Sequence, residues 1–428
     1  MFVLIIVIFV LGYTAIALEH PLRVNKAAPA LLTGMLIWSA IMLFPDQLGL
    51  AASSDELVAR LYHHLSGAAS ILFFLMGAMA VVDLIDAHSG FQVVTDRIAT
   101  TNRRRLLWLV GAFTFVLSAI LDNLTTSIVM AALMRKLMAD REDVWTFGGV
   151  VIIAANAGGA WSPIGDVTTI MLWIGGQVTT WNIIATTLLP SLVCATLPLL
   201  WLSVTQRGEV RRPAEQEYRE EAMVPKRERI TVFVLGLATL LGVPVFKSLT
   251  HLPPFMGIMF GLGILWCYTE VIHARSKEDR GQYRVTAILR HIDHASILFF
   301  LGILIAIGGL ETSGHLTRLA SFLDQWLPNV FARTSAIGVL SAVIDNVPLV
   351  AAAQGMYPLS AFPPDHMFWE LLALCAGTGG SLLVFGSAAG VAVMGVLQMD
   401  FMWYVRRMLV PAALGYVGAI ATFWLMWA

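Results

Sequence analysis

Charged residues are scarce in this chain of 428 residues: only 13% are Asp, Glu, Lys or Arg, whereas 58% are hydrophobic. The mean hydropathy is +0.77. No water-soluble globular protein of this size needs so apolar a composition, so the sequence predicts an integral membrane protein with several crossings. The net charge of −1 gives no reason to expect a nucleic-acid partner.

Cysteine is also scarce, and a phosphate-binding loop is missing. Cys194, Cys267 and Cys375 lie in apolar runs, where we expect reduced, small hydrophobic side chains rather than metal ligands or disulfides. No Gly-rich loop ends in Lys-Ser or Lys-Thr, so energy from ATP would have to come from another subunit. We therefore expect neither an enzyme nor a cofactor.

Long apolar runs dominate what is present. Residues 1–18 carry no basic start and no clean cleavage site, so we expect them to be retained as the first crossing. The apolar runs predict ten crossings, at residues 2–18, 27–44, 68–87, 145–175, 183–205, 230–247, 254–272, 295–312, 367–397 and 402–427.

Two further apolar stretches, 106–134 and 334–357, each carry an Asp-Asn pair in the middle: Asp122-Asn123 and Asp345-Asn346. A carboxylate at membrane depth is costly. No Lys or Arg lies in the dozen residues before Asp122, or between Arg333 and the far side of Asp345, so the missing partner is expected to be a cation. Each stretch is predicted to form a re-entrant helical hairpin.

The distribution of basic residues supports the hairpins. If the N-terminus lies outside and both stretches return to their own side, 23 of the 27 Lys and Arg residues fall on the cytoplasmic side. The others are Arg60, Lys247, Arg318 and Arg333. Such a bias fits the enrichment of Lys and Arg in cytoplasmic loops, and a single crossing by either stretch would scramble it.

An internal repeat organises the chain. The polar segment 207–229, expected to be a cytoplasmic linker, separates residues 1–206 from residues 230–428, and each part has five crossings and one hairpin. Because five is odd, hairpin 106–134 should open to the cytoplasm and hairpin 334–357 to the outside. SILFFL, Ser-Gly, Asp-Asn and Gly-Gly recur in order at separations of 226, 224, 223 and 221 residues. The predicted fold is an all-α inverted-repeat transporter.

The spans that follow the hairpins are too rich in Gly, Pro, Ser and Thr for unbroken helices. They read NAGGAWSPIGDVTTIMLW at 156–173 and GTGGSLLVFGSAAGVAVMG at 377–395. We expect two broken transmembrane helices, because irregular backbone at membrane depth persists only where it lines a cavity or is buried in protein. Each Gly-Gly pair can serve either an ion site or close helix packing.

Hard oxygen ligands gather in these segments, and such ligands suit a dehydrated alkali cation. We expect the first half to dominate cation binding and Asp345 to join the same cavity or a weaker site. The candidate ligands are Asp122, Asn123, Thr125, Thr126, Asn156, Gly158, Gly159, Asp166, Thr168 and Thr169 in the first half, and Asp345, Asn346 and Ser387 in the second.

Together these motifs, with HHLSGAASILFFLMGAMAVVDLIDAHSGF at 63–91, resemble the NhaD-type sodium/proton antiporters of the ion transporter superfamily over nearly the whole chain. The resemblance implies a homodimer with a scaffold part, a mobile transport part and two opposed re-entrant hairpins. It also implies exchange of Na⁺ or Li⁺ for H⁺. We expect the chain in a bacterial inner membrane with its N-terminus outside.

Coupling requires only competition. A carboxylate stripped of water resists ionisation, so near neutral or alkaline pH it can hold a proton or Na⁺ but not both well. Asp122, Asp166 and Asp345 are the leading candidates for this role, and Asp83, Asp86 and Glu311 come next. His63, His64 and His88 are expected to be solvated.

Two rival functions remain open. Arsenite efflux, known among superfamily members, suits a neutral substrate but invites a sulfur ligand, and only Cys375 lies near a motif. Dicarboxylate transport is disfavoured because acidic residues would repel an anion. An intramembrane aspartyl protease also needs two buried Asp residues, but Asp166 follows Pro-Ile-Gly rather than Gly-x-Gly.

Overall fold

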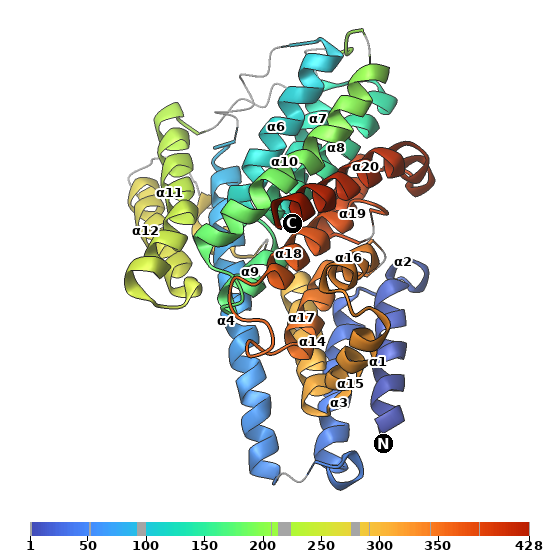
Figure 1. Ribbon diagram of the computed structural model, residues 1–428. Coiled ribbons are helices and arrows are strands. Elements are labelled where there is room, and N and C mark those ends of the chain that lie inside the picture. Colours follow the sequence, from blue (N-terminus) through green and yellow to red (C-terminus); the bar gives the residue numbers. More distant parts are fainter. Residues whose placement is uncertain are drawn as a thin grey trace.

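A computed structural model of the chain describes residues 2–50, 53–91, 100–206, 208–212, 224–274, 283–290, 292–342, 344–384 and 386–427. All regular secondary-structure elements within these ranges are helices (Figure 1). The β-type pairing found there is an isolated bridge between Asn102 and Glu209. Of the linker expected at 207–229, residues 207 and 213–223 lie outside the described residues.

The helices follow the apolar pattern of the sequence. Those before the linker are α1 (Phe2–Ala17), α2 (Glu19–Leu22), α3 (Ala27–Leu43), α4 (Ser54–Ala87), α6 (Arg103–Leu121), α7 (Asn123–Leu137), α8 (Arg141–Ala160), α9 (Val167–Ile174) and α10 (Thr180–Thr205). Those after it are α11 (Lys226–Thr250), α12 (Pro254–Ala274), α13 (Val285–Ile288), α14 (His294–Thr312), α15 (His315–Trp326), α16 (Val330–Leu340), α17 (Asn346–Met356), α18 (Met367–Gly379), α19 (Ala388–Leu397) and α20 (Phe401–Trp427).

Seven helices among the described residues are long and apolar enough to cross a membrane: α4, α6, α10, α11, α12, α14 and α20. The sequence predicted ten crossings. Two of the ten are short helices, since α1 has 16 residues and α3 has 17. The predicted spans 145–175 and 367–397 are each interrupted. Conversely, α6 is long enough to cross without the help of α7, although the sequence predicts it as one half of a hairpin.

Large apolar side chains remain exposed on the outer helices, for example Val234 on α11, Phe260 on α12 and Val417 on α20. A water-soluble monomer rarely exposes such extensive apolar surface. The expected class, an all-helical polytopic membrane protein, is confirmed.

Helix α4 is longer than predicted, because it begins at Ser54 rather than near residue 68 and runs for 34 residues. Its start is fixed by a capping box: Ser53 Oγ accepts a hydrogen bond from the Glu56 amide, while the Glu56 carboxylate accepts one from the Ser53 amide. This local signal extends the helix beyond the apolar span.

The two halves of the chain interlock (Figure 1). Helix α4 packs against α14, α8 against α18, and α10 against α20. In each pair the two helices are about as far apart in the sequence as the recurring motifs are. In addition, α6 and α7 both pack against α8, while α16 and α17 both pack against α18. This arrangement brings the two interrupted helices to the centre of the molecule.

The first of the two interrupted helices breaks further along the sequence than expected. Helix α8 ends at Ala160 and α9 begins at Val167, so Gly158 and Gly159 are helical. A Cβ atom on Gly158 would lie 2.2 Å from the Phe115 carbonyl oxygen of α6, which shows that this glycine permits close helix contact. In the second half, a Cβ atom on Gly379 would lie 2.3 Å from the Gly338 carbonyl oxygen of α16. The same close crossing is therefore built twice.

Candidate functional site

Asp122 forms the turn between α6 and α7 and is the N-cap of α7. Its Oδ1 accepts a hydrogen bond from the Thr125 amide at 2.7 Å, and its Oδ2 accepts one from Thr125 Oγ1 at 3.0 Å. The backbone φ of Asp122 is 102°, a value that side-chain-bearing residues rarely adopt. Such a conformation costs about 1–3 kcal/mol and persists only where the surrounding structure enforces it.

Asp166 is the N-cap of α9 and lies at the centre of a buried polar network. Its Oδ1 accepts hydrogen bonds from the Thr168 amide at 2.9 Å and from Thr168 Oγ1 at 2.7 Å. Its Oδ2 accepts one from Asn123 Nδ2 at 2.6 Å, and Asn346 Nδ2 lies 3.4 Å from both oxygens. One carboxylate therefore receives amide groups from both Asp-Asn motifs.

Asn156 extends this network into the second half. Its Oδ1 accepts a hydrogen bond from Asn123 at 3.1 Å, and its Nδ2 donates to Ser381 Oγ at 2.9 Å and to Ser387 Oγ at 3.0 Å. Ser387 is the N-cap of α19. Ser381 was missed by the sequence reasoning, although its place two residues after a Gly-Gly motif was a usable signal.

The hydrogen bonds that Asp122 and Asp166 accept within the described part of the chain all come from neutral amides, hydroxyls or backbone N–H groups. No ion pair of either carboxylate with Lys or Arg is found there. The Asp122 and Asp166 carboxylates are also close enough to interact electrostatically. Negative charge therefore concentrates where the two interrupted segments meet.

Asp345 differs, and the expectation that it lacks a basic partner is wrong. Lys26 Nζ lies 3.2 Å from Asp345 Oδ2, with 26% and 14% of the two side chains exposed. The ammonium also lies 4.3 Å from the centre of the Phe299 ring on α14. No basic residue lies near Asp345 in the sequence, and its partner comes from a position 319 residues earlier.

A cavity of about 940 Å³ lies beside the network. Thr125, Leu383 and Ala388 contribute to its wall, so it reaches the first Asp-Asn motif and the interruption before α19. Its acidic lining residues are Glu19, Asp83, Asp86, Asp293 and Asp345, and Lys26 is the basic residue among the described lining. The cavity is therefore strongly acidic.

The remaining candidates divide into two groups. The hydroxyl oxygens of Thr126 and Thr169 are buried and have no hydrogen-bond partner among the described residues, which leaves them able to accept an additional contact. Glu311, in contrast, is exposed at the end of α14 and is not among the residues that line the cavity.

Comparison with known proteins agrees with this architecture. A family model described as "Citrate transporter" (CitMHS) matches residues 3–372. Sodium/proton antiporter 1 of Arabidopsis thaliana is 48% identical over 97% of this chain and 71% of that protein. Sodium/proton antiporter 2 of the same plant is 43% identical over 97% of both chains. The Na⁺/H⁺ antiporter NhaD of Vibrio cholerae is 32% identical over 97% of this chain and 90% of its own length.

These matches confirm the resemblance recognised from the motifs. Because the family model covers most of the sequence and the relatives align over nearly all of it, the chain belongs to the CitMHS transporter family, in the group that includes the NhaD-type sodium/proton antiporters.

Proposed function

We propose that this chain is a secondary active transporter that exchanges Na⁺ or Li⁺ for H⁺. The observation that carries the proposal is the Asp166 carboxylate, which is 1% exposed and is held by neutral donors from both halves of the chain. A buried carboxylate without a basic partner favours either a proton or a bound cation. The names of the relatives support this choice of substrates.

The cation site comprises the oxygens of Asp122 and Asp166 together with nearby amide and hydroxyl groups. Na⁺ binds the Asp166 carboxylate in place of the neutral hydrogen-bond donors. A proton that binds the same carboxylate displaces Na⁺. If the loaded site changes sides more readily than the empty one, proton entry drives Na⁺ extrusion. The polar side chains available for this exchange are Asn123, Asn156, Thr126, Thr168 and Thr169.

Alternating access uses the repeated construction. Helices α6–α7 and α16–α17 act as two opposed re-entrant hairpins in an inverted repeat. The repeated close crossings at Gly158 and Gly379 support this relation. Ser118 Oγ donates to the Ala155 carbonyl and Ser341 Oγ to the Ala376 carbonyl, so a buried hydrogen bond is repeated too.

The membrane arrangement follows from the same proposal. Residues 1–206 and 230–428 form the two repeats, and the N-terminus lies outside. The acidic cavity then opens toward the cytoplasm, because Lys26 and Asp293 lie at helix ends on that side. We place the chain in a bacterial inner membrane as a homodimer.

Flux measurements with reconstituted protein test the exchange. The chain is placed in liposomes containing a pH-sensitive dye, and Na⁺, Li⁺, K⁺, citrate and arsenite are added in turn. Na⁺ or Li⁺ should move protons, and the apparent KM for Na⁺ should fall as pH rises because the two ions compete. Asp122→Asn liposomes should show no Na⁺-dependent signal. Proton movement with citrate alone, or a pH-independent KM, would contradict the proposal.

The rival substrates fit the cavity less well. Citrate would enter a chamber whose described lining has five acidic side chains and one lysine, which disfavours an anion. Arsenite would favour thiol ligands, but the cavity lining includes no cysteine among the described residues, and Cys375 is buried on α18. In an aspartyl protease the two catalytic carboxylates share a proton. Here Asp122 and Asp166 each accept a hydrogen bond from a different threonine, Thr125 and Thr168.

The Lys26 ammonium competes with Na⁺ for Asp345. We expect Lys26→Met to lower the apparent KM for Na⁺ about 3- to 10-fold, equivalent to about 1 kcal/mol for a partly exposed ion pair. Proteoliposome flux at graded Na⁺ concentrations measures this change. Arg104→Met, at an exposed position on α6, is the control and should leave KM unchanged. An unchanged KM in Lys26→Met would remove Asp345 from the cation pathway.

A further inference from the structure

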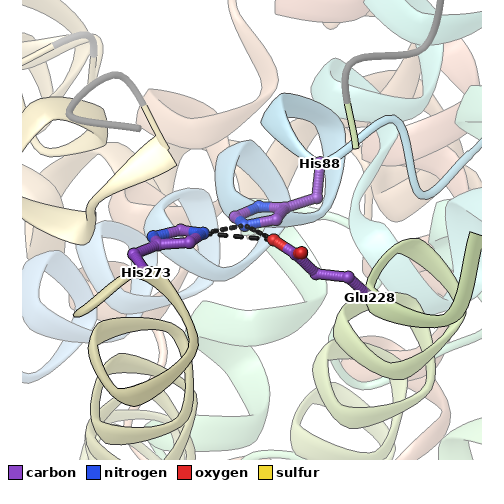
Figure 2. A group of neighbouring side chains, drawn as sticks. All are labelled: His88, Glu228 and His273. Atoms are coloured by element: carbon purple, nitrogen blue, oxygen red, sulfur yellow. Dashed lines mark hydrogen bonds and ion pairs between the residues drawn. The ribbon is translucent and has the colours of Figure 1, made fainter. Parts of the chain in front are cut away.

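Three metal-ligating side chains meet away from the cavity (Figure 2). His88 directly follows α4, Glu228 lies in the first turn of α11, and His273 lies in the last turn of α12. His88 was expected to be solvated, but it is 0% exposed, and Glu228 and His273 are 7% and 5% exposed. None of the three is among the residues that line the cavity, so the cluster is separate from the proposed cation site.

Their ligand atoms form a compact triangle. His88 Nε2 lies 3.3 Å from His273 Nε2, His273 Nε2 lies 3.2 Å from Glu228 Oε1, and His88 Nε2 lies 3.7 Å from the same oxygen. In a tetrahedral zinc site with bonds of about 2.0–2.1 Å, neighbouring ligand atoms are separated by about 3.3–3.4 Å. The triangle therefore has nearly the size that a shared Zn²⁺ ion would impose.

The imidazole rings present their edges to each other. Their planes differ by only 6° and their centres are 5.3 Å apart, whereas the two Nε2 atoms are closer, at 3.3 Å. His88 Nδ1 lies 2.8 Å from the Leu84 carbonyl oxygen. A carbonyl oxygen can only accept a hydrogen bond, so Nδ1 carries the hydrogen and the neutral ring offers its Nε2 lone pair to the cluster. A backbone carbonyl commonly orients metal-binding histidines in this way.

In the described part of the chain, His273 has no orienting partner comparable to the one that His88 has. Its Nδ1 atom is buried and has no hydrogen-bond partner among the described residues. If His273 served only as a hydrogen-bond donor to His88 and Glu228 through Nε2, the lone pair of Nδ1 would be buried without a partner, which is unfavourable. If Nε2 bound a metal, the ring hydrogen would move to Nδ1 and would likewise lie buried without an acceptor among those residues, so Nδ1 does not distinguish a metal site from a hydrogen-bond network. The ligand triangle and the orientation of His88 carry the assignment.

We propose that His88, Glu228 and His273 bind one divalent transition-metal ion, for which Zn²⁺ fits best. Two imidazoles and one carboxylate form a ligand set typical of zinc, with a fourth position left for water. The ring of Tyr283 covers the cluster, with its centre 5.4 Å from that of His88 and 6.1 Å from that of His273. The ion fastens α11 and α12 to the end of α4.

The cluster lies close in sequence to two acidic residues of the cavity. Asp83 and Asp86 lie on α4 within five residues of His88, and both line the acidic cavity. A metal ion that restrains the end of α4 also restrains these carboxylates. Because the ion would bind the folded protein, we expect Zn²⁺ to raise its thermal stability. Because the cluster is separate from the cavity, we expect Zn²⁺ not to be transported.

Metal titration of the purified full chain tests the proposal. The protein carries an affinity tag without histidine, is treated with a chelator, and is then equilibrated with Zn²⁺ or Co²⁺ alone. Elemental analysis should give one ion per chain, and bound Co²⁺ should show the strong visible bands of a four-coordinate ion. Thermal denaturation should shift to higher temperature with Zn²⁺.

Matched variants identify the ligands. Glu228→Gln and His273→Gln should each weaken Zn²⁺ binding by about 100-fold or more. His294→Gln alters an exposed histidine at the start of α14 and should bind like the unaltered chain. If a variant fails to fold, the stoichiometry and Co²⁺ spectrum of the unaltered chain still decide the question. No bound ion in that chain, or unchanged affinity in both folded variants, would reduce the cluster to a hydrogen-bond network.

Discussion

Replacing Asp166 with Asn is expected to reduce Na⁺-dependent proton flux by about 100-fold or more, because loss of a buried charged ligand commonly costs about 3 kcal/mol. The carboxylate accepts hydrogen bonds from Thr168 and Asn123, and Asn346 lies nearby. An amide in its place would have no negative charge for Na⁺ and no site for the exchanged proton. Proteoliposomes with a pH-sensitive dye measure the flux.

The fold should survive this change, because Asn is also a good N-cap and can still accept a hydrogen bond from the Thr168 amide. Asp140→Asn is the matched control: Asp140 is the N-cap of α8 but is exposed, so its flux should equal that of the unaltered chain. Na⁺ should raise the melting temperature of the unaltered protein and of Asp140→Asn, but not that of Asp166→Asn. Normal flux in Asp166→Asn would exclude this carboxylate as the exchange site.

Much of the candidate site could be predicted from sequence because polar groups are rare in apolar spans. Asn123, Asn156 and Asp166 all stand within strongly apolar segments, and the structure joins all three by hydrogen bonds. The cost of burying such groups alone requires that they find one another or an ion. Sequence spacing alone therefore indicated a shared polar centre.

Other features depend on contacts between distant segments, for which no local pattern exists. Lys26 reaches Asp345, the N-cap of α17, because α14 packs against both α3 and α17. His88 and His273 stand at the ends of apolar helices, where a histidine is ordinarily solvated, and only the packing of α11 and α12 against α4 buries them. Glycine patterns were similarly ambiguous: Gly158 permits a close helix contact, and its part in an ion site stays a prediction.

This role of glycine gives the second large expected effect. Gly158→Ala should destabilise the protein by about 3 kcal/mol or more, at the upper end of overpacking effects. The new Cβ would lie 2.2 Å from the Phe115 carbonyl oxygen and 2.9 Å from two further backbone atoms of that residue. Backbone inside a helix cannot rotate aside as a flexible side chain can, so α6 must move away from α8.

The matched substitutions separate this crossing from a general intolerance of glycine replacement. Gly379→Ala should be equally harmful, because its Cβ would lie 2.3 Å from the Gly338 carbonyl oxygen in the second half. Gly263→Ala lies within α12 with nothing within 4 Å of the added atom, so its stability should be unchanged or slightly raised. Thermal denaturation in detergent, with size-exclusion chromatography to measure folded yield, compares the three. Equal stability of all three variants would contradict the close crossings that hold both interrupted helices at the centre of the transporter.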